Sequence, residues 1–270
     1  MRVPRKGQGL AGRLAWTEAG NGPPALLIHG DFSHGRGAWS RQLEALSGEA
    51  RLIAVDRRGF GRSPEGDGEP GIVSDAEDIA SLLDVLGLRR VLVGAHSYGG
   101  LVGVEFAARY PDRVRGLLLV EPPYLSLIAE NPDAADLAGR VAEIAAHGAV
   151  RTPEELAERF FRAVAGEDEF ERLRASSAWP EIAYQGQRID RAASVADFPA
   201  ARLDDLDPPL LMRVFRGGRS HPALRAAAAE IARRRGAPLV TVPEAGHAVQ
   251  LVGTAVTDGM REMLRQSGER

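Results

Sequence analysis

Short apolar runs alternate with amphipathic segments along the chain from Ala25 onward. Apolar runs of about four to eight residues between turn residues are typical of strands that are buried on both faces of a sheet. Six runs fit this description, and we expect strands at 25–30, 51–56, 90–97, 116–121, 209–215 and 238–243. Because helical patterns separate these runs, the sequence predicts an α/β fold with a mostly parallel sheet and helices on both of its faces.

Several residues between the apolar runs carry signals for helix ends. Ser74 and Glu77 have the spacing of a capping box, which predicts a helix start there, and Gly87 can end that helix. Pro111 is expected to stop the helix that follows the third apolar run. The basic run 233–235 is expected in the last turn of another helix, because cations there face the negative end of the helix dipole.

The alternation of strands and helices is interrupted between the fourth and fifth runs, where helical patterns follow one another without a convincing strand. An inserted group of helices is the expected explanation. The sequence therefore predicts an α/β core at 1–124 and 205–270, with a helical lid at 125–204. Within the lid, 152–164 reads as a capped amphipathic helix with Thr152 as its N-cap.

Composition excludes several classes of protein and site. Hydrophobic residues make up 44% of the 270 residues and charged residues 26%, which is the balance of a soluble globular protein. A formal net charge of −3 favours neither nucleic acid nor an anionic membrane surface as a partner. The absence of cysteine excludes disulfides and thiolate metal sites. No apolar run reaches the ~18 residues of a spanning helix, and no signal peptide is evident, so we expect a cytoplasmic protein.

The third apolar run leads into the segment AHSYGG, which is followed by a helical pattern. Ser97 lies at this junction, with the small residues Ala95 and Gly99 two positions before and after it. The segment resembles the G-x-S-x-G nucleophile elbow of the α/β hydrolases, with alanine in place of the first glycine. The resemblance implies that Ser97 is a nucleophile. The N-terminus of the helix and the amide of Tyr98 would then face the negative charge that develops in the reaction.

A second motif, His29 and Gly30, ends the first apolar run. In the same family this pattern precedes a backbone donor of the oxyanion hole. The resemblance implies that the N–H of Asp31 acts together with that of Tyr98, with Phe32 as the alternative donor. Because a carboxylate would disfavour a neighbouring oxyanion, the Asp31 side chain is expected to point away.

A glycine-containing loop at 56–63 resembles the D-x-x-G-x-G-x-S loop of the α/β hydrolases. A dinucleotide-binding loop is the alternative, but the third glycine of G-x-G-x-x-G would fall at Pro64. The G-K-[ST] signature of phosphate loops and the H-E-x-x-H signature of zinc proteases do not occur. The sequence therefore predicts neither a cofactor nor a metal.

A general base is expected after the last strand, because the order in this fold is serine, acid, histidine. His247 is in that position, within the segment EAGHAVQ. Two other histidines, His29 and His96, belong to motifs that depend on the backbone. The remaining three do not follow a strand in the required way: His34, His147 and His221.

The acid of the expected triad is displaced. The common position after the penultimate strand falls at Ser220 or His221, neither of which has a carboxylate. Glu121 directly follows the strand after Ser97, 24 residues further along the chain. Some haloalkane dehalogenases and fungal macrolactone hydrolases resemble this arrangement, so Glu121 is the preferred acid. The alternatives are Asp204, Asp205, Asp207 and Glu244.

These motifs predict a serine hydrolase that cleaves an ester or lactone of a small to medium, fairly apolar substrate through an acyl-enzyme. A C–C or C–CN bond-cleaving enzyme and a ligand sensor with slow turnover are the alternatives. Dehalogenation is disfavoured, because it needs a carboxylate in place of the nucleophilic serine. The aromatic residues of the lid either face the pocket or pack the lid. The candidates for substrate contact are Phe32, His96, Trp179 and Tyr184.

Overall fold

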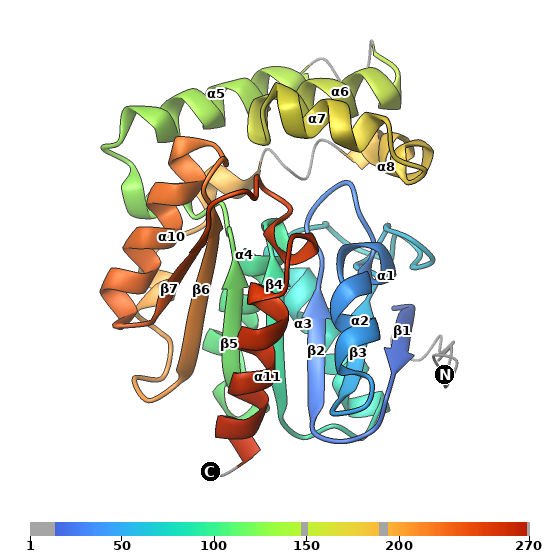
Figure 1. Cartoon of the computed structure of the whole chain (residues 1–270), viewed down its shortest axis with the longest axis vertical. Helices are drawn as coiled ribbons and strands as arrows, with labels where there is room; N and C mark the ends of the chain where they lie inside the picture. Colours follow the sequence, from blue (N-terminus) through green and yellow to red (C-terminus); the bar gives the residue numbers. More distant parts are fainter. Residues whose placement is uncertain (1–13, 147–150, 189–193, 269–270) are drawn as a thin grey trace.

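The computed structural model describes residues 14–146, 151–188 and 194–268. These residues contain a seven-stranded sheet in the order β1-β3-β2-β4-β5-β6-β7. β1 is antiparallel to β3, and the other neighbours are parallel. The prediction of a mostly parallel α/β sheet is confirmed (Figure 1). The strands are β1 Trp16–Ala19, β2 Pro24–Ile28, β3 Arg51–Val55, β4 Val91–His96, β5 Val114–Val120, β6 Leu211–Gly217 and β7 Leu239–Val242.

Helices cover both faces of this sheet (Figure 1). Successive strand residues point to opposite faces, so Leu26 packs in the cluster with α3, α4 and α10, whereas Leu27 packs in the cluster with α2 and α11. Burial on both faces explains the nearly continuous apolar runs of the sequence. The helices are α1 Gly35–Ala38, α2 Ser40–Leu46, α3 Ile72–Val85, α4 Tyr98–Arg109, α10 Pro222–Arg235 and α11 Ala255–Gly268.

Helix ends follow the local sequence at most positions. Gly87 lies just after α3 with φ +65°, and Pro111 follows the end of α4 and begins the short 3-10 helix Pro111–Arg113. Arg233 to Arg235 form the last turn of α10, as predicted. The predicted capping box at Ser74 is wrong. α3 begins at Ile72, which places Ser74 inside the first turn, where its hydroxyl donates to the carbonyl of Gly71 at 3.1 Å.

Between β5 and β6 the described residues form helices and turns. We call α5 to α8 the cap helices, and Figure 1 shows them above one end of the sheet. Thr152 caps α6 through the predicted capping box with Glu155. The division into core and lid stays a prediction. The helices are α5 Pro132–Ala146, α6 Pro153–Val164, α7 Glu167–Arg174 and α8 Trp179–Tyr184, and the 3-10 turns are Leu125–Ile128, Gln185–Arg188, Ser194–Asp197 and Ala200–Leu203.

Candidate active site

Ser97 lies in a strained turn between β4 and α4. Its backbone has φ 53° and ψ −130°, which a side chain rarely adopts and which is typical of residues held at functional sites. The turn passes close to the end of β2, because a Cβ on Gly99 would lie 2.4 Å from the carbonyl oxygen of His29. Glycine is therefore required two residues after the serine, and the strained turn aims Ser97 away from the sheet.

Ser97, His247 and Glu121 are hydrogen-bonded in series. His247 Nε2 is 2.9 Å from Ser97 Oγ, and His247 Nδ1 is 2.8 Å from Glu121 Oε2. The carboxylate can only accept, so Nδ1 carries the proton and Nε2 is left to accept from the serine hydroxyl. All three residues are buried, Glu121 completely. The arrangement can remove a proton from Ser97 while the resulting imidazolium is stabilised by Glu121.

Glu121 is held by β6 as well as by its own strand. Its backbone N–H donates to the carbonyl of Phe215 at 3.0 Å, and its Oε1 accepts from the N–H of Gly217 at 2.7 Å. With a φ of 45°, the residue turns sharply out of β5. Among the candidate acids, Glu121 is the one that the structure brings to His247 Nδ1. Asp205 pairs instead with Arg202.

Ser220 occupies the position that lacks the usual acid. Its side chain is buried, and its hydroxyl has no hydrogen-bond partner within the described part of the chain. A Cβ on Gly217 would lie 2.6 Å from Ser220 Oγ, so the hydroxyl is close to the backbone that supports Glu121. The position therefore remains near the acid, although it carries no carboxylate.

Two further buried histidines, His29 and His96, lie close to the site but stay neutral. His96 Nε2 is 3.0 Å from the carbonyl oxygen of His247 and donates to it. Burial, and then the charge of His247, lower the pKa of His96 to about 3. Burial, followed by the charge of Arg57, holds the pKa of His29 well below its usual range. Neither histidine gains a proton near neutral pH.

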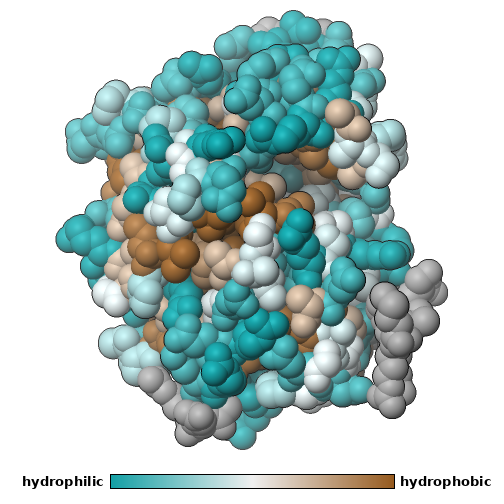
Figure 2. Space-filling view, viewed as in Figure 1, coloured by the Kyte–Doolittle hydropathy of each residue, from teal (hydrophilic) through white to brown (hydrophobic). Residues whose placement is uncertain are grey.

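Two cavities meet at Ser97 and His247, and Asp31 and Phe160 also line both. The narrower one, about 40 Å³, runs below α5 and has a mostly apolar wall that includes Leu137. The wider one has about 810 Å³ and extends below α7 and α8. The outer surface at the end of the molecule where the cap helices lie is largely hydrophilic in this view, and apolar surface appears below it (Figure 2). The site is suited to a substrate with an apolar part on at least one side of the reacting bond.

The residues expected to contact substrate are not all at these cavities. Phe32 and His96 line the wider one, and Phe32 stacks on Phe160 with ring centroids 4.4 Å apart. Trp179 lines neither cavity. It packs edge-on against the ring of Phe170, and its Nε1 donates to Glu154 at 3.0 Å. Tyr184 is 63% exposed and also outside both walls.

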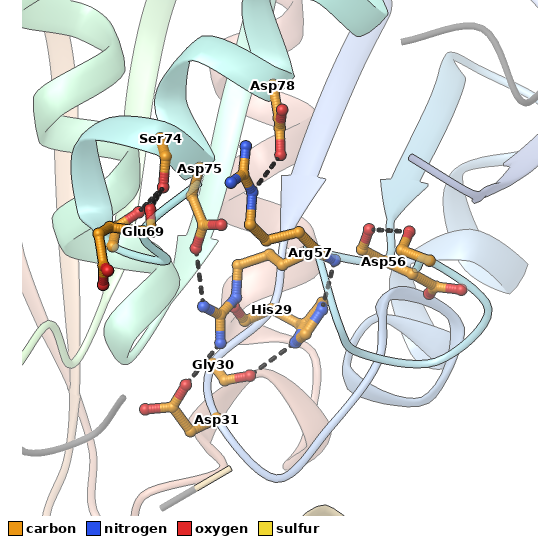
Figure 3. Close-up of polar contacts among 12 residues, drawn as sticks. His29, Gly30, Asp31, Asp56, Arg57, Glu69, Ser74, Asp75 and Asp78 are labelled. Carbon is orange, nitrogen blue, oxygen red and sulfur yellow. Dashed lines mark hydrogen bonds and ion pairs between the residues drawn. The ribbon is translucent and has the colours of Figure 1, made fainter. Parts of the chain in front are cut away.

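Two contacts near the site had no signal in the sequence. Glu169, on α7, accepts a hydrogen bond of 3.1 Å from the N–H of Ala248, next to His247. A cap helix therefore touches the loop of the candidate base. The Asp31 carboxylate is directed at the buried Arg57, with a distance of 2.6 Å between Asp31 Oδ1 and Arg57 Nη2 (Figure 3). Both contacts join segments far apart in the chain, which a local pattern does not reveal.

Other kinds of site are not evident in the described residues. No group of three or more histidine, aspartate or glutamate side chains in 14–146, 151–188 and 194–268 is arranged to hold a metal ion. None of the helices described there has the length and apolar character needed to cross a membrane.

A mostly parallel sheet with serine, histidine and a carboxylate joined at the ends of its strands is the arrangement of an α/β hydrolase. Residues 25–258 match the model of the alpha/beta hydrolase family, and the chain belongs to that family.

Three similar proteins extend the comparison. A protein described as a carbamate hydrolase in Azorhizobium caulinodans is 40% identical over 101 residues, which span 37% of this chain and 38% of that relative. A thermophilic esterase from Thermogutta terrifontis has a similar structure, with a TM-score of 0.72, 29% identity and coverage of 94% of this chain and 93% of the other. An enol-lactonase from Burkholderia xenovorans has a TM-score of 0.73 at 21% identity, covers 93% and 96% of the two chains, and shows likeness of fold alone.

Proposed function

We propose that the protein is a serine hydrolase that cleaves a carboxylic ester or a lactone through an acyl-enzyme intermediate. The hydrogen-bonded series from Ser97 through His247 to Glu121 is the observation that carries this proposal. The similar esterase from Thermogutta terrifontis, 29% identical to this chain, agrees with it. The substrate class proposed is a small to medium molecule with a largely apolar acyl or alcohol part.

Each residue of the series has one role in the proposed reaction. His247 Nε2 takes the proton of Ser97 as its oxygen attacks the carbonyl carbon, and then gives that proton to the departing alkoxide. Water attacks the resulting acyl ester with His247 again as the base, which releases the acid and restores Ser97. Glu121 keeps the proton on Nδ1 and stabilises the imidazolium in both halves.

The tetrahedral intermediate needs donors for its oxyanion. Tyr98 follows Ser97 as the first residue of α4, so its N–H lies at the positive end of a helix. Asp31 lines both cavities with Ser97 and is the expected source of the second N–H. Two backbone donors aimed at the same oxygen stabilise the transition state by several kcal/mol. Removal of one such donor commonly lowers kcat by about 10²–10³.

The two cavities give the proposal its substrate preference. Because Ser97 lies where they meet, the groups on the two sides of a scissile ester would extend into different cavities. The narrow apolar one limits the size of one group, and the wider one tolerates a larger group. C–C bond cleavage and a sensor role remain the alternatives to ester hydrolysis, and both predict poor turnover of simple esters.

A panel of esters and lactones tests the proposed function. We expect turnover of p-nitrophenyl acetate and butanoate and a decline toward the dodecanoate, because the narrow cavity has little room for a long chain. Short-chain and medium-ring lactones are measured in parallel by acid release. Absence of turnover across the whole panel, by a folded protein, would contradict an ester or lactone hydrolase.

The pH dependence of kcat/KM follows from which histidines can titrate. We expect kcat/KM to rise with pH across the range from about 5 to 8, because only neutral His247 can accept the serine proton. His96, with its pKa lowered to about 3 by burial, stays neutral throughout that range and contributes no ionisation.

Two variants serve as controls for this profile. His221→Asn removes a titrating ring yet retains a residue that can cap α10, and His34→Gln removes the ring that pairs with Glu181. Both variants are expected to keep the rising limb in rate measurements between pH 4 and 9. Loss of the limb in either one would move the general base away from His247.

A further inference from the structure

A buried cation, Arg57, lies between Asp31 and Asp75 and is hydrogen-bonded to both (Figure 3). The side chain is only 1% exposed. Its Nη2 donates to Asp31 Oδ1 at 2.6 Å and its Nη1 to Asp75 Oδ2 at 3.0 Å. Its Nε donates to the carbonyl oxygen of His29 at 3.1 Å. The guanidinium therefore joins the end of β2 to α3 through three directed hydrogen bonds.

The backbone of Arg57 holds the same loop. Its N–H donates to His29 Nε2 at 3.0 Å, which leaves His29 Nδ1 as the protonated nitrogen. Nδ1 then donates to the carbonyl of Gly30 at 2.6 Å. Arg57 therefore binds this loop at three groups: the ring of His29, the carbonyl oxygen of His29 and the carboxylate of Asp31.

Arg57 also touches the second side of the proposed oxyanion hole. Its guanidinium carbon lies 4.3 Å from the centroid of the Tyr98 ring and 4.4 Å from that of Phe60. A cation over an aromatic face is attracted to it, and more strongly when both are buried. One side chain therefore contacts both residues whose backbone N–H groups are the proposed oxyanion donors.

We propose that Arg57 is the positioning residue of the oxyanion hole, which it holds by anchoring Asp31 and Tyr98 at the same time. The inference rests on the proposed function. A buried ion cluster is a poor source of stability, because well-packed apolar residues often stabilise a core as well or better. Fixed geometry is what this cluster supplies.

The carboxylate of Asp31 gives the same contact an electrostatic role. Asp31 is the residue whose amide is to face a developing negative charge, and its own negative side chain would oppose that charge if it swung into the cavity. The hydrogen bond of 2.6 Å from Arg57 fixes the carboxylate and offsets its charge. The expected Asp31 orientation, away from the reacting oxygen, thus has a specific partner.

Substitution of Arg57 tests the proposal through kcat rather than stability alone. Arg57→Lys keeps a cation but cannot make three divergent hydrogen bonds, and Arg57→Met removes the charge. With p-nitrophenyl butanoate we expect kcat to fall about 10- to 100-fold, less than or similar to the loss of one oxyanion donor, with KM changed less than about threefold. A trifluoromethyl ketone, whose adduct has an oxyanion, should bind more weakly by a similar factor.

Arg58→Met is the matched control. Arg58 comes from the same loop and pairs with Asp78 on the same helix, α3, at 2.7 Å. Its Nη1 donates to the carbonyl oxygen of Asp67 at 3.2 Å. We expect this variant to lose stability, measured by thermal unfolding, while kcat and trifluoromethyl ketone affinity stay within about twofold for the folded protein.

Asp31→Ala provides a second test if neither Arg57 variant folds. It removes the carboxylate that Arg57 binds but retains the backbone N–H of residue 31, and it leaves Arg57 paired with Asp75. The same fall in kcat and ketone affinity is expected. Unchanged kcat in folded Arg57→Lys or Asp31→Ala, or equal losses in the Arg57 and Arg58 variants, would overturn the inference. A wild-type protein that turns over no ester would instead overturn the proposed function.

Discussion

Replacing Ser97 with alanine is expected to abolish turnover and to prevent covalent labelling by a fluorophosphonate. Loss of the nucleophile in a serine hydrolase commonly lowers kcat by about 10⁶, because the remaining groups act as a unit with it. The hydroxyl is the only part removed, and its oxygen is 2.9 Å from His247 Nε2. Alanine retains the Cβ at the strained φ of 53°, so the fold of the turn should be kept.

Mass spectrometry of the labelled protein provides the measurement. A single adduct is expected on the peptide that contains Ser97, and none in Ser97→Ala. Ser220→Ala is the control, because Ser220 is a buried serine near the same site that lacks a hydrogen bond to His247 in the described structure. This control should be labelled like the wild type. An adduct on a different serine, or persistent turnover in Ser97→Ala, would refute the assignment.

The central strands β2 to β5 were predictable because they are short apolar runs with both faces buried. The edge strand β1, Trp16–Ala19, escaped prediction because it has four residues and its sequence WTEA includes two polar ones. The error at Ser74 has a tertiary origin. Ile72 is buried in the core cluster, and the helix begins early enough to bury it, so packing outweighed the capping signal.

Some residues of the candidate site could be predicted from local sequence motifs, and others depend on tertiary packing. Ser97 and His247 lie in local motifs at strand ends, which the sequence displays directly. Trp179 and Tyr184 have no such motif, because the orientation of a cap helix depends on tertiary packing. The ring of Trp179 is buried against Phe170, and Tyr184 faces outward. The link from Arg57 to Asp31 joins two loops 26 residues apart, so only the folded chain reveals it.

Glutamine at position 121 is expected to lower kcat by about 10²–10⁴ in a folded protein, the range suggested by the equivalent change in a serine protease triad. Both oxygens of Glu121 accept hydrogen bonds, one from the N–H of Gly217 and one from His247. Glutamine has one oxygen, and the backbone N–H of Gly217 can only donate. The amide NH₂ therefore faces His247 and favours the tautomer with its proton on Nε2, which cannot accept the proton of Ser97.

Steady-state rates and thermal unfolding of Glu121→Gln test this expectation, with Glu244→Gln as the matched control. Glu244 is one of the other candidate acids and lines the wider cavity, whereas His247 Nδ1 is hydrogen-bonded to Glu121. Its substitution should change kcat less than about threefold. Nearly full activity in folded Glu121→Gln would refute the displaced acid and return attention to Asp204, Asp205, Asp207 and Glu244.

A carboxylate supplied from β6 should partly replace the one lost from β5. Ser220 Oγ is buried close to Gly217, the residue whose N–H holds Glu121 Oε1, so an aspartate there begins near the end of the side chain at position 121. We expect Ser220→Asp, added to Glu121→Gln, to recover about tenfold in kcat, because even an imperfectly placed carboxylate favours the Nδ1 proton on His247. Ser220→Asp alone should give no gain, since two buried carboxylates would then compete for one imidazole. A double variant no faster than Glu121→Gln would show that the loop after β6 holds position 220 out of reach of the ring.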